Sequence, residues 1–170
     1  MSNLPAEFSD TGLCQVLDDA GRLLPGRTVG LEAQTLRKMY ETLVLIRVLD
    51  DRMIKWQRTG RISFYGAAFG EEGAVVGSAA PLKPEDWLFP ALRQGGAALY
   101  RGYDLKNYIA NVLGNAGDIL KGRQMPCHYA DRAINQVSWS SCIGPQIPQA
   151  AGAAWAFKIK KEKKIAVGYL

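Results

Sequence analysis

Residues 150–170 read AAGAAWAFKIKKEKKIAVGYL, and the order of residue types in this stretch decides the fold. Ala150–Ile159 is rich in alanine, which favours a helix, and a lysine-rich turn follows it. The apolar end, Ile165–Leu170, predicts a buried strand of a parallel sheet. A helix, a polar turn and an apolar strand are the halves of a doubly wound layer. We therefore expect an α/β fold with a parallel sheet flanked by helices.

The rest of the chain supplies further elements for such a layer. Four segments are expected to be regular: helices over Gln34–Arg58, Ala74–Ala80 and Leu105–Leu113, and a buried strand over Trp87–Phe89. Gly60 follows the first helix as a C-terminal glycine should, and Asp104 is a suitable N-cap for the third. Residues 1–33 lack periodicity and are expected to form an N-terminal arm, which leaves 34–170 as one partial α/β domain.

Composition limits the class of protein. The 170 residues, 48% apolar and 22% charged, suffice for one globular domain. No run of about 18 apolar residues occurs, so we expect no membrane span. The net charge is +5, and five lysines fall within Lys158–Lys164. Because no aromatic residues are interleaved with them, they predict the solvated end of a helix and not a nucleic-acid surface.

Cysteine usage and the N-terminus bear on location. Three widely spaced cysteines without a CxxC pair argue for a reducing compartment, and one histidine cannot anchor a His-rich zinc site. Met1–Asp10 carries acidic residues and no basic leader, so we expect neither a secretory nor a mitochondrial targeting segment. The cytoplasm is the expected location, or the mitochondrial matrix if the source is eukaryotic.

Two short stretches carry the residue types of a binding site. Arg93–Gly96 directly follows the expected strand Trp87–Phe89, so an arginine could present a fixed cation beside glycines that let the backbone approach an anion. An ordinary loop salt bridge is the alternative. Ser140–Gln146 precedes a helix expected to begin near Pro148, where hydroxyls and free backbone groups can bind a polar ligand or an ion. Simple N-capping is the alternative there.

Three other groups admit both a chemical and a structural interpretation. The loop Gly122–Tyr129 contains the sole histidine, His128, which could be catalytic or structural. Glu71 and Glu72 could act as an acid/base pair or stabilise the start of a helix. Cys142 has no histidine near it in the sequence, so its spacing does not support a nucleophile.

The order of five motifs along the chain is more specific than any one of them. The motifs are Gly60–Tyr65, Gly70–Gly73, Leu99–Gly102, Gly122–Tyr129 and Gln146–Ala150. Over about residues 34–170 the chain resembles the alpha subunits of thiamine-diphosphate-dependent 2-oxoacid dehydrogenases. Its Ser-Phe-Tyr, Gly-Glu-Glu-Gly and Gly-Arg-Gln-Met-Pro runs are similar to the branched-chain (2-oxoisovalerate) type. A pyruvate or acetoin dehydrogenase subunit and a non-catalytic, partner-binding fragment are the alternatives.

The resemblance implies a coenzyme site within a thiamine-diphosphate-binding fold. Arg93 corresponds to the family arginine that grips the diphosphate. Ser141 and Ile143 correspond to positions whose backbone groups hold the aminopyrimidine, and Ile143 would also be the apolar wedge that bends the coenzyme. Leu92 stands where the family usually has a tyrosine that contacts the cofactor. Phe64 and Tyr65 would lie near the side chain of the substrate.

The resemblance also implies metal ions. Ser140, Cys142 and Gln146 correspond to a structural potassium site, although Pro145 replaces a threonine whose hydroxyl would bind that ion. The magnesium ligands of the family follow a strand like Ile165–Leu170, so we expect them outside this chain. We therefore expect a truncated domain that is inactive by itself.

Partners and activity follow from the same resemblance. The family works as an α2β2 assembly in which the beta subunit supplies the glutamate that activates the aminopyrimidine. The whole enzyme would decarboxylate a branched-chain 2-oxoacid oxidatively and pass the acyl group to the lipoyl domain of an acyltransferase.

Overall fold

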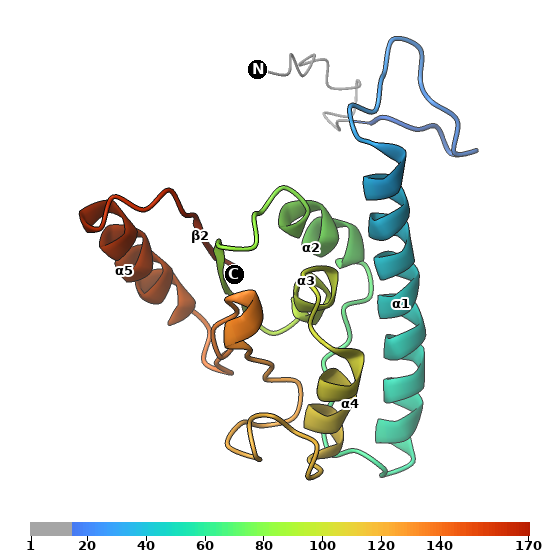
Figure 1. Cartoon of the computed structure of the whole chain (residues 1–170). Helices are drawn as coiled ribbons and strands as arrows, with labels where there is room; N and C mark the ends of the chain where they lie inside the picture. The colour runs from blue at the N-terminus through green and yellow to red at the C-terminus, as the bar shows by residue number, and fades with distance from the viewer. Residues whose placement is uncertain (1–14) are drawn as a thin grey trace. The chain divides into compact units, whose positions relative to one another are not determined.

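The computed structural model describes residues 15–170 (Figure 1). The acidic stretch Met1–Asp10 lies outside the described residues. The chain divides into two compact units, Met1–Leu36 and Arg37–Leu170. In the first unit, Leu17 and Leu23 form an isolated antiparallel bridge. The turn between them is fixed by Asp18, whose carboxylate accepts hydrogen bonds from two backbone N–H groups. The division into an arm of residues 1–33 and a domain of 34–170 stays a prediction.

The long amphipathic helix expected over Gln34–Arg58 is present as α1, Ala33–Arg58. One face of α1 is buried, with Ile46 and Met53 almost fully covered. The helix is followed by Gly60, whose φ of 72° lies in the left-handed region that glycine adopts without strain. No helix among residues 15–170 is long and apolar enough to cross a membrane.

The shorter elements follow the predicted order with some corrections. They are α2 Glu72–Ala79, β1 Trp87–Phe89, α3 Gly95–Tyr100, α4 Leu105–Leu113, a 3₁₀ turn Arg132–Ile134, α5 Gln146–Ile159 and β2 Ala166–Gly168. Asp104 caps α4 as predicted, because its carboxylate accepts from the N–H groups of Lys106 and Asn107. The prediction missed α3, and it started α2 and α5 each two residues too late.

The predicted parallel sheet is confirmed as a two-stranded pair, β1 beside β2, with Leu88 opposite Val167. Helix α5 packs against both strands. The α/β class is therefore confirmed. The prediction that Ile165–Leu170 is buried is wrong, since Ile165 and Leu170 are 54% and 79% exposed. Among the described residues β2 pairs on one edge only, so its apolar side chains are only partly covered.

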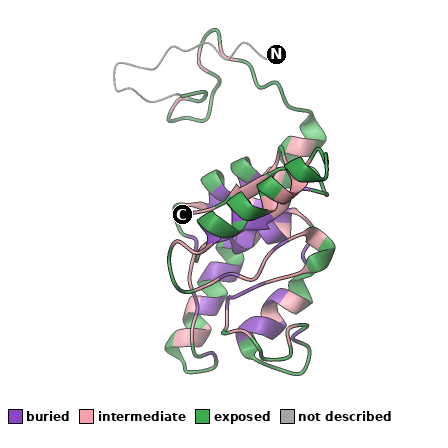
Figure 2. Cartoon of the chain, turned by 90° about the vertical axis from the view of Figure 1, so that its left-hand side faces the viewer, coloured by how far each residue is buried: buried purple, intermediate pink, exposed green. Residues whose placement is uncertain are grey.

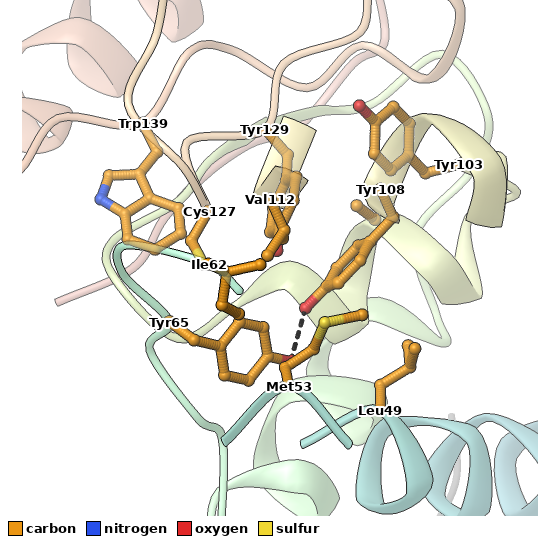
Figure 3. Close-up of a cluster of buried hydrophobic side chains, with 11 residues drawn as sticks. Leu49, Met53, Ile62, Tyr65, Tyr103, Tyr108, Val112, Cys127, Tyr129 and Trp139 are labelled. Atoms are coloured by element: carbon orange, nitrogen blue, oxygen red, sulfur yellow. Dashed lines mark hydrogen bonds between the residues drawn. The ribbon is translucent and has the colours of Figure 1, made fainter. Parts of the chain in front are cut away.

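Two buried clusters hold the second unit together. One lies among α1, α4 and the loops that carry Tyr65, Tyr129 and Trp139 (Figure 3). The other joins α1, α2, α3 and β1 through residues such as Val76, Leu88 and Ala97. In the view turned toward α5, buried residues lie inside the unit whereas α5 itself is largely exposed (Figure 2).

A buried acid lies beside the first cluster. Asp50 of α1 accepts hydrogen bonds from the Tyr65 hydroxyl at 2.7 Å and from the Ala68 N–H at 2.8 Å. The Tyr65 hydroxyl also lies 3.0 Å from that of Tyr108 (Figure 3). Burial raises the pKa of Asp50 above its ordinary value, against the lowering effect of these hydrogen bonds. Asp50 thus ties α1 to the loop before α2.

Two glycines offer a matched test of this packing. In Gly95→Ala the new Cβ would lie 2.9 Å from Tyr129 Cε2 and 3.1 Å from Tyr108 Cε2, and these two rings are stacked at 4.1 Å. We expect the free energy of unfolding, measured by urea denaturation, to fall by about 1–3 kcal/mol. Gly77→Ala in α2 meets no atom within 4 Å and should raise it by about 0.5–1 kcal/mol. Equal effects of the two substitutions would contradict this account.

Candidate functional site

A cavity of about 220 Å³ lies at the carboxyl edge of the β1–β2 pair. Because the strands are parallel, the segments that follow them emerge at the same edge, which is where ligands bind in open α/β sheets. The turn that opens α5 completes the walls. Predicted site residues on these walls are Leu92, Arg93, Ser140, Ser141, Ile143 and Gln146. The two stretches singled out in the sequence therefore meet at one cavity.

Arg93 faces this cavity with an exposed side chain. Its Nη1 atom lies 3.4 Å from Glu71 Oε1, and both side chains are more than 40% exposed. The loop salt bridge considered as the alternative is thus present. An exposed ion pair of this length contributes little and is readily exchanged for a better anion. The guanidinium therefore stays accessible to solvent.

The turn that carries Arg93 is held from within. The buried Gln94 side chain accepts a hydrogen bond from the N–H of Ala91 at 2.9 Å. The two glycines that follow were expected to let the backbone approach an anion, and that interpretation is wrong. Gly95 and Gly96 are buried, and a Cβ on either would collide with Tyr129 or Ile46. They allow α3 to pack closely and do not line the cavity.

The turn Ser140–Gln146 is also fixed by its own polar groups. The Ser140 hydroxyl accepts from the N–H of Cys142 at 3.2 Å. The buried Gln146 amide accepts from the N–H of Gly144 at 3.1 Å and donates to the Tyr169 carbonyl at 2.6 Å. Gln146 therefore clamps the turn to the end of β2. These side chains fix the turn from within, whereas Pro145, the N-cap of α5, has no side-chain capping hydrogen bond.

Ile143, unlike the polar side chains of this turn, is not used to hold the turn. It is 86% exposed, although isoleucine is usually buried in folded proteins. It borders the same cavity as Arg93. The cavity thus offers a cation, hydroxyls and an exposed apolar side chain. This combination suits a ligand that is anionic at one part and flat and apolar at another.

His128 does not line this cavity but contacts Ser141, which does, and spacing could not predict that contact. Its Nε2 atom lies 2.5 Å from the hydroxyl oxygen of Ser141, and its Nδ1 atom lies 2.9 Å from the Pro126 carbonyl oxygen. The ring stacks on Trp139 at 4.5 Å. The motif Gly122–Tyr129 was the only signal in the sequence, and it did not indicate which residue the histidine would contact.

The two adjacent glutamates do not form an acid/base pair. Glu72, in the first turn of α2, binds Arg47 and accepts from the N–H of Gly70 at 2.9 Å. Burial would raise its pKa, but hydrogen bonds from its own N–H, Gly70 and Arg47 hold that pKa below the ordinary value. Glu71 turns toward Arg93 instead.

Cys142, Phe64 and Tyr65 do not line the cavity. The Cys142 thiol is exposed and free. Tyr65 is buried in the first cluster, and Phe64 is half-buried against it. Their assignment to the substrate stays a prediction. Within residues 15–170 no group of three or more His, Cys, Asp or Glu side chains could hold a metal ion.

Comparison with known proteins agrees with the geometry. Residues 40–170 match the family described as Dehydrogenase E1 component. The chain is 46% identical over 139 residues to the mitochondrial 2-oxoisovalerate dehydrogenase subunit alpha of Caenorhabditis elegans, covering 81% of this chain and 32% of that protein. It is 38% identical over 166 residues to the Homo sapiens protein of that name, covering 97% and 37%. The chain spans about a third of the length of these curated relatives.

The clamp formed by Gln146 can be tested on the chain itself. In Gln146→Ala the Gly144 N–H and the Tyr169 carbonyl lose their partner. We expect the free energy of unfolding to fall by about 1–3 kcal/mol. Gln149→Ala is the control, because Gln149 is an exposed residue of the same helix and should change it by less than about 0.5 kcal/mol. Indistinguishable urea midpoints for the two variants would exclude the clamp.

Proposed function

The chain belongs to the dehydrogenase E1 component family, and on this premise we propose that it acts within the alpha subunit of a 2-oxoisovalerate dehydrogenase. That enzyme would decarboxylate branched-chain 2-oxoacids oxidatively and transfer the acyl group to a lipoyl domain. The observation that carries the proposal is the single cavity lined by both Arg93 and the Ser140–Ile143 turn. The names and identities of the relatives support the branched-chain assignment.

The proposed ligand of the cavity is thiamine diphosphate. The exposed guanidinium of Arg93 fits a diphosphate, since arginine binds phosphate oxygens through two parallel N–H groups. Ser141 and Ile143 would hold the aminopyrimidine, with Ile143 as the apolar surface that supports the bent coenzyme. The exposed position of Ile143 fits this role. When bound, the coenzyme supplies the carbanion chemistry that decarboxylation requires.

Leu92 marks a difference within the proposed site. Its side chain is 40% exposed and borders the cavity, but it is apolar. It would exclude water from the diphosphate region without donating a hydrogen bond. Arg93 would then carry more of the diphosphate binding from this side of the cavity.

Metal ions are a further part of the proposal. Magnesium would accompany the diphosphate, although within residues 15–170 no group of three or more His, Cys, Asp or Glu side chains could hold it. Potassium at Ser140, Cys142 and Gln146 has less support, because Pro145 offers no hydroxyl. In addition, the Gln146 amide already bonds Gly144 and Tyr169.

The proposed partners are a beta subunit, in an α2β2 assembly, and a lipoyl-bearing acyltransferase. Large apolar side chains are exposed on α1 and α5, which supports the proposal that a partner subunit covers them. They include Tyr40, Trp155 and Ile159, each at least 66% exposed. These side chains also favour the second candidate function, a non-catalytic fragment that binds a partner. The relatives carry mitochondrial names, which supports the matrix over the cytoplasm.

The role of Arg93 predicts a selective loss of affinity. In the assembly of the full-length alpha subunit with its beta subunit, we expect Arg93→Gln to weaken thiamine diphosphate binding by roughly 10- to 100-fold, because charge-assisted hydrogen bonds are lost. Binding of thiamine, which lacks the diphosphate, should not change. Arg58→Gln, at the exposed end of α1, is the control. Calorimetry that finds equal losses for both ligands would count against the assignment.

The choice between the branches of the family can be measured by turnover. We expect the same assembly to have a kcat/KM for 2-oxoisovalerate at least about tenfold higher than for pyruvate, since a larger apolar side chain gains a few kcal/mol in a matching pocket. A preference for pyruvate or acetoin would assign the chain to another branch. Absence of turnover with every 2-oxoacid, in an assembly that forms, would favour the non-catalytic function.

A further inference from the structure

The resemblance to the dehydrogenase family predicts that an ion holds the turn before α5. It places a structural potassium at Ser140, Cys142 and Gln146. The relatives add a threonine hydroxyl where this chain has Pro145. Potassium is held by oxygen atoms that together replace its hydration shell. Whether this turn can hold the ion therefore depends on which of its oxygen atoms are already in use.

The side-chain oxygens of the turn accept hydrogen bonds from within it. Gln146 Oε1 accepts from the N–H of Gly144 at 3.1 Å, and Ser140 Oγ accepts from the N–H of Cys142 at 3.2 Å. The other end of the Gln146 amide is occupied too, because Nε2 donates to the Tyr169 carbonyl at 2.6 Å. An N–H can only donate and a carbonyl can only accept, so these two partners determine which way the amide points. A cation bound to Oε1 would meet the positive end of the Gly144 N–H.

The location of the turn is also unfavourable for a cation. It lies at the N-terminus of α5, where unpaired N–H groups give a helix its positive end. The first turn of α5, residues 146–149, contains no acidic residue that could offset the repulsion. Pro145 contributes no hydroxyl. The residues of this turn therefore do not fit a potassium ion.

The backbone on either side of the Gly144–Pro145 bond restrains the turn by other means. Pro145 is the N-cap of α5 with a φ of −57°, close to the angle that the proline ring enforces. The ring restrains the unfolded chain as well, so less entropy is lost on folding. Gly144 has a φ of 106°, in the region that favours glycine, and its carbonyl accepts from the N–H of Ile147 at 3.0 Å. Two consecutive residues thus set the direction in which α5 begins.

We propose that the turn before α5 is organised without potassium, and that the Pro145 ring and the Gln146 amide together take the place of the ion. The ring fixes the start of the helix, and the amide joins the turn to the end of β2. This inference concerns the stability of the chain and goes beyond the proposed function, because it does not depend on what the cavity binds. It predicts that stability is the same whichever monovalent cation is present.

Thermal unfolding of the chain measures this cation dependence. The Tm is compared in potassium, sodium and choline chloride at one concentration of about 100 mM, so that surface charges are screened equally. We expect the three Tm values to agree within about 1 °C, since no cation binds the folded chain selectively. A potassium site with a Kd of about 1 mM would instead raise the Tm in potassium chloride by roughly 5–10 °C. A saturable rise of this kind would overturn the inference.

Two variants of the chain show what holds the turn. We expect the Tm to fall by roughly 2–12 °C in Gln146→Ala, which removes the amide, and by roughly 1–4 °C in Pro145→Ala, which removes the ring. Each fall should be equal in potassium and in choline, and Gln149→Ala is the exposed control. If the Gln146 oxygen were a ligand of potassium, Gln146→Ala would lower the Tm in potassium alone. That result, or an unchanged Tm in both variants, would contradict the proposal.

The full-length alpha subunit gives a second measurement, which decides the matter if the chain alone melts without a cooperative transition. Pro145→Thr restores the hydroxyl that the resemblance predicts. We expect this variant to lower the Tm of the subunit by the same amount in both salts, because the Gln146 oxygen still accepts from Gly144. A loss that potassium reverses and choline does not would show that the ion can occupy the turn. Failure of the assembled enzyme to bind thiamine diphosphate would contradict the proposed function and leave these comparisons unaffected.

Discussion

The parallel pairing of Trp87–Phe89 with Ala166–Gly168 is the contact on which the candidate site depends. It brings the segment after β1 and the end of β2 to one edge, although about 80 residues separate the strands. Two buried side chains reinforce the pair. Asp86 accepts from the Ile165 N–H at 2.8 Å, and Gln146 donates to the Tyr169 carbonyl at 2.6 Å. This pairing therefore places Arg93 and the turn before α5 beside one cavity.

Polar groups around the cavity serve two purposes at once. Gln94, Gln146 and His128 are buried, and their side chains form hydrogen bonds within the turns around the cavity. Arg93 and Ile143, which these turns carry, stay exposed. A binding wall that is fixed before the ligand arrives loses less conformational entropy on binding. The hydrogen bonds of the buried side chains therefore hold Arg93 and Ile143 in position for a ligand.

The errors of prediction have identifiable causes. The run Arg93-Gln94-Gly95-Gly96 resembles a loop because glycine disfavours helices. Helix α3 nevertheless begins at Gly95, where a Cβ would collide with the ring of Tyr129, so packing and not helix propensity selects glycine there. Ile165–Leu170 is apolar, but composition does not say how many of its neighbours are present to cover it. By contrast, α1 was predicted to within one residue because apolar residues recur at helical spacing from Leu36 to Ile54.

Local pattern alone determined the helices α1 and α4, the strand β1 and the α/β class, because periodicity and capping act between residues close in sequence. The ordered motifs determined the family and the candidate site residues. The resemblance implied that Arg93 and Ser141 serve one coenzyme. Only the tertiary structure showed that both line one cavity and that His128 contacts Ser141. Those contacts join residues that are distant along the chain, and their existence depends on strand pairing and core packing that no local pattern encodes.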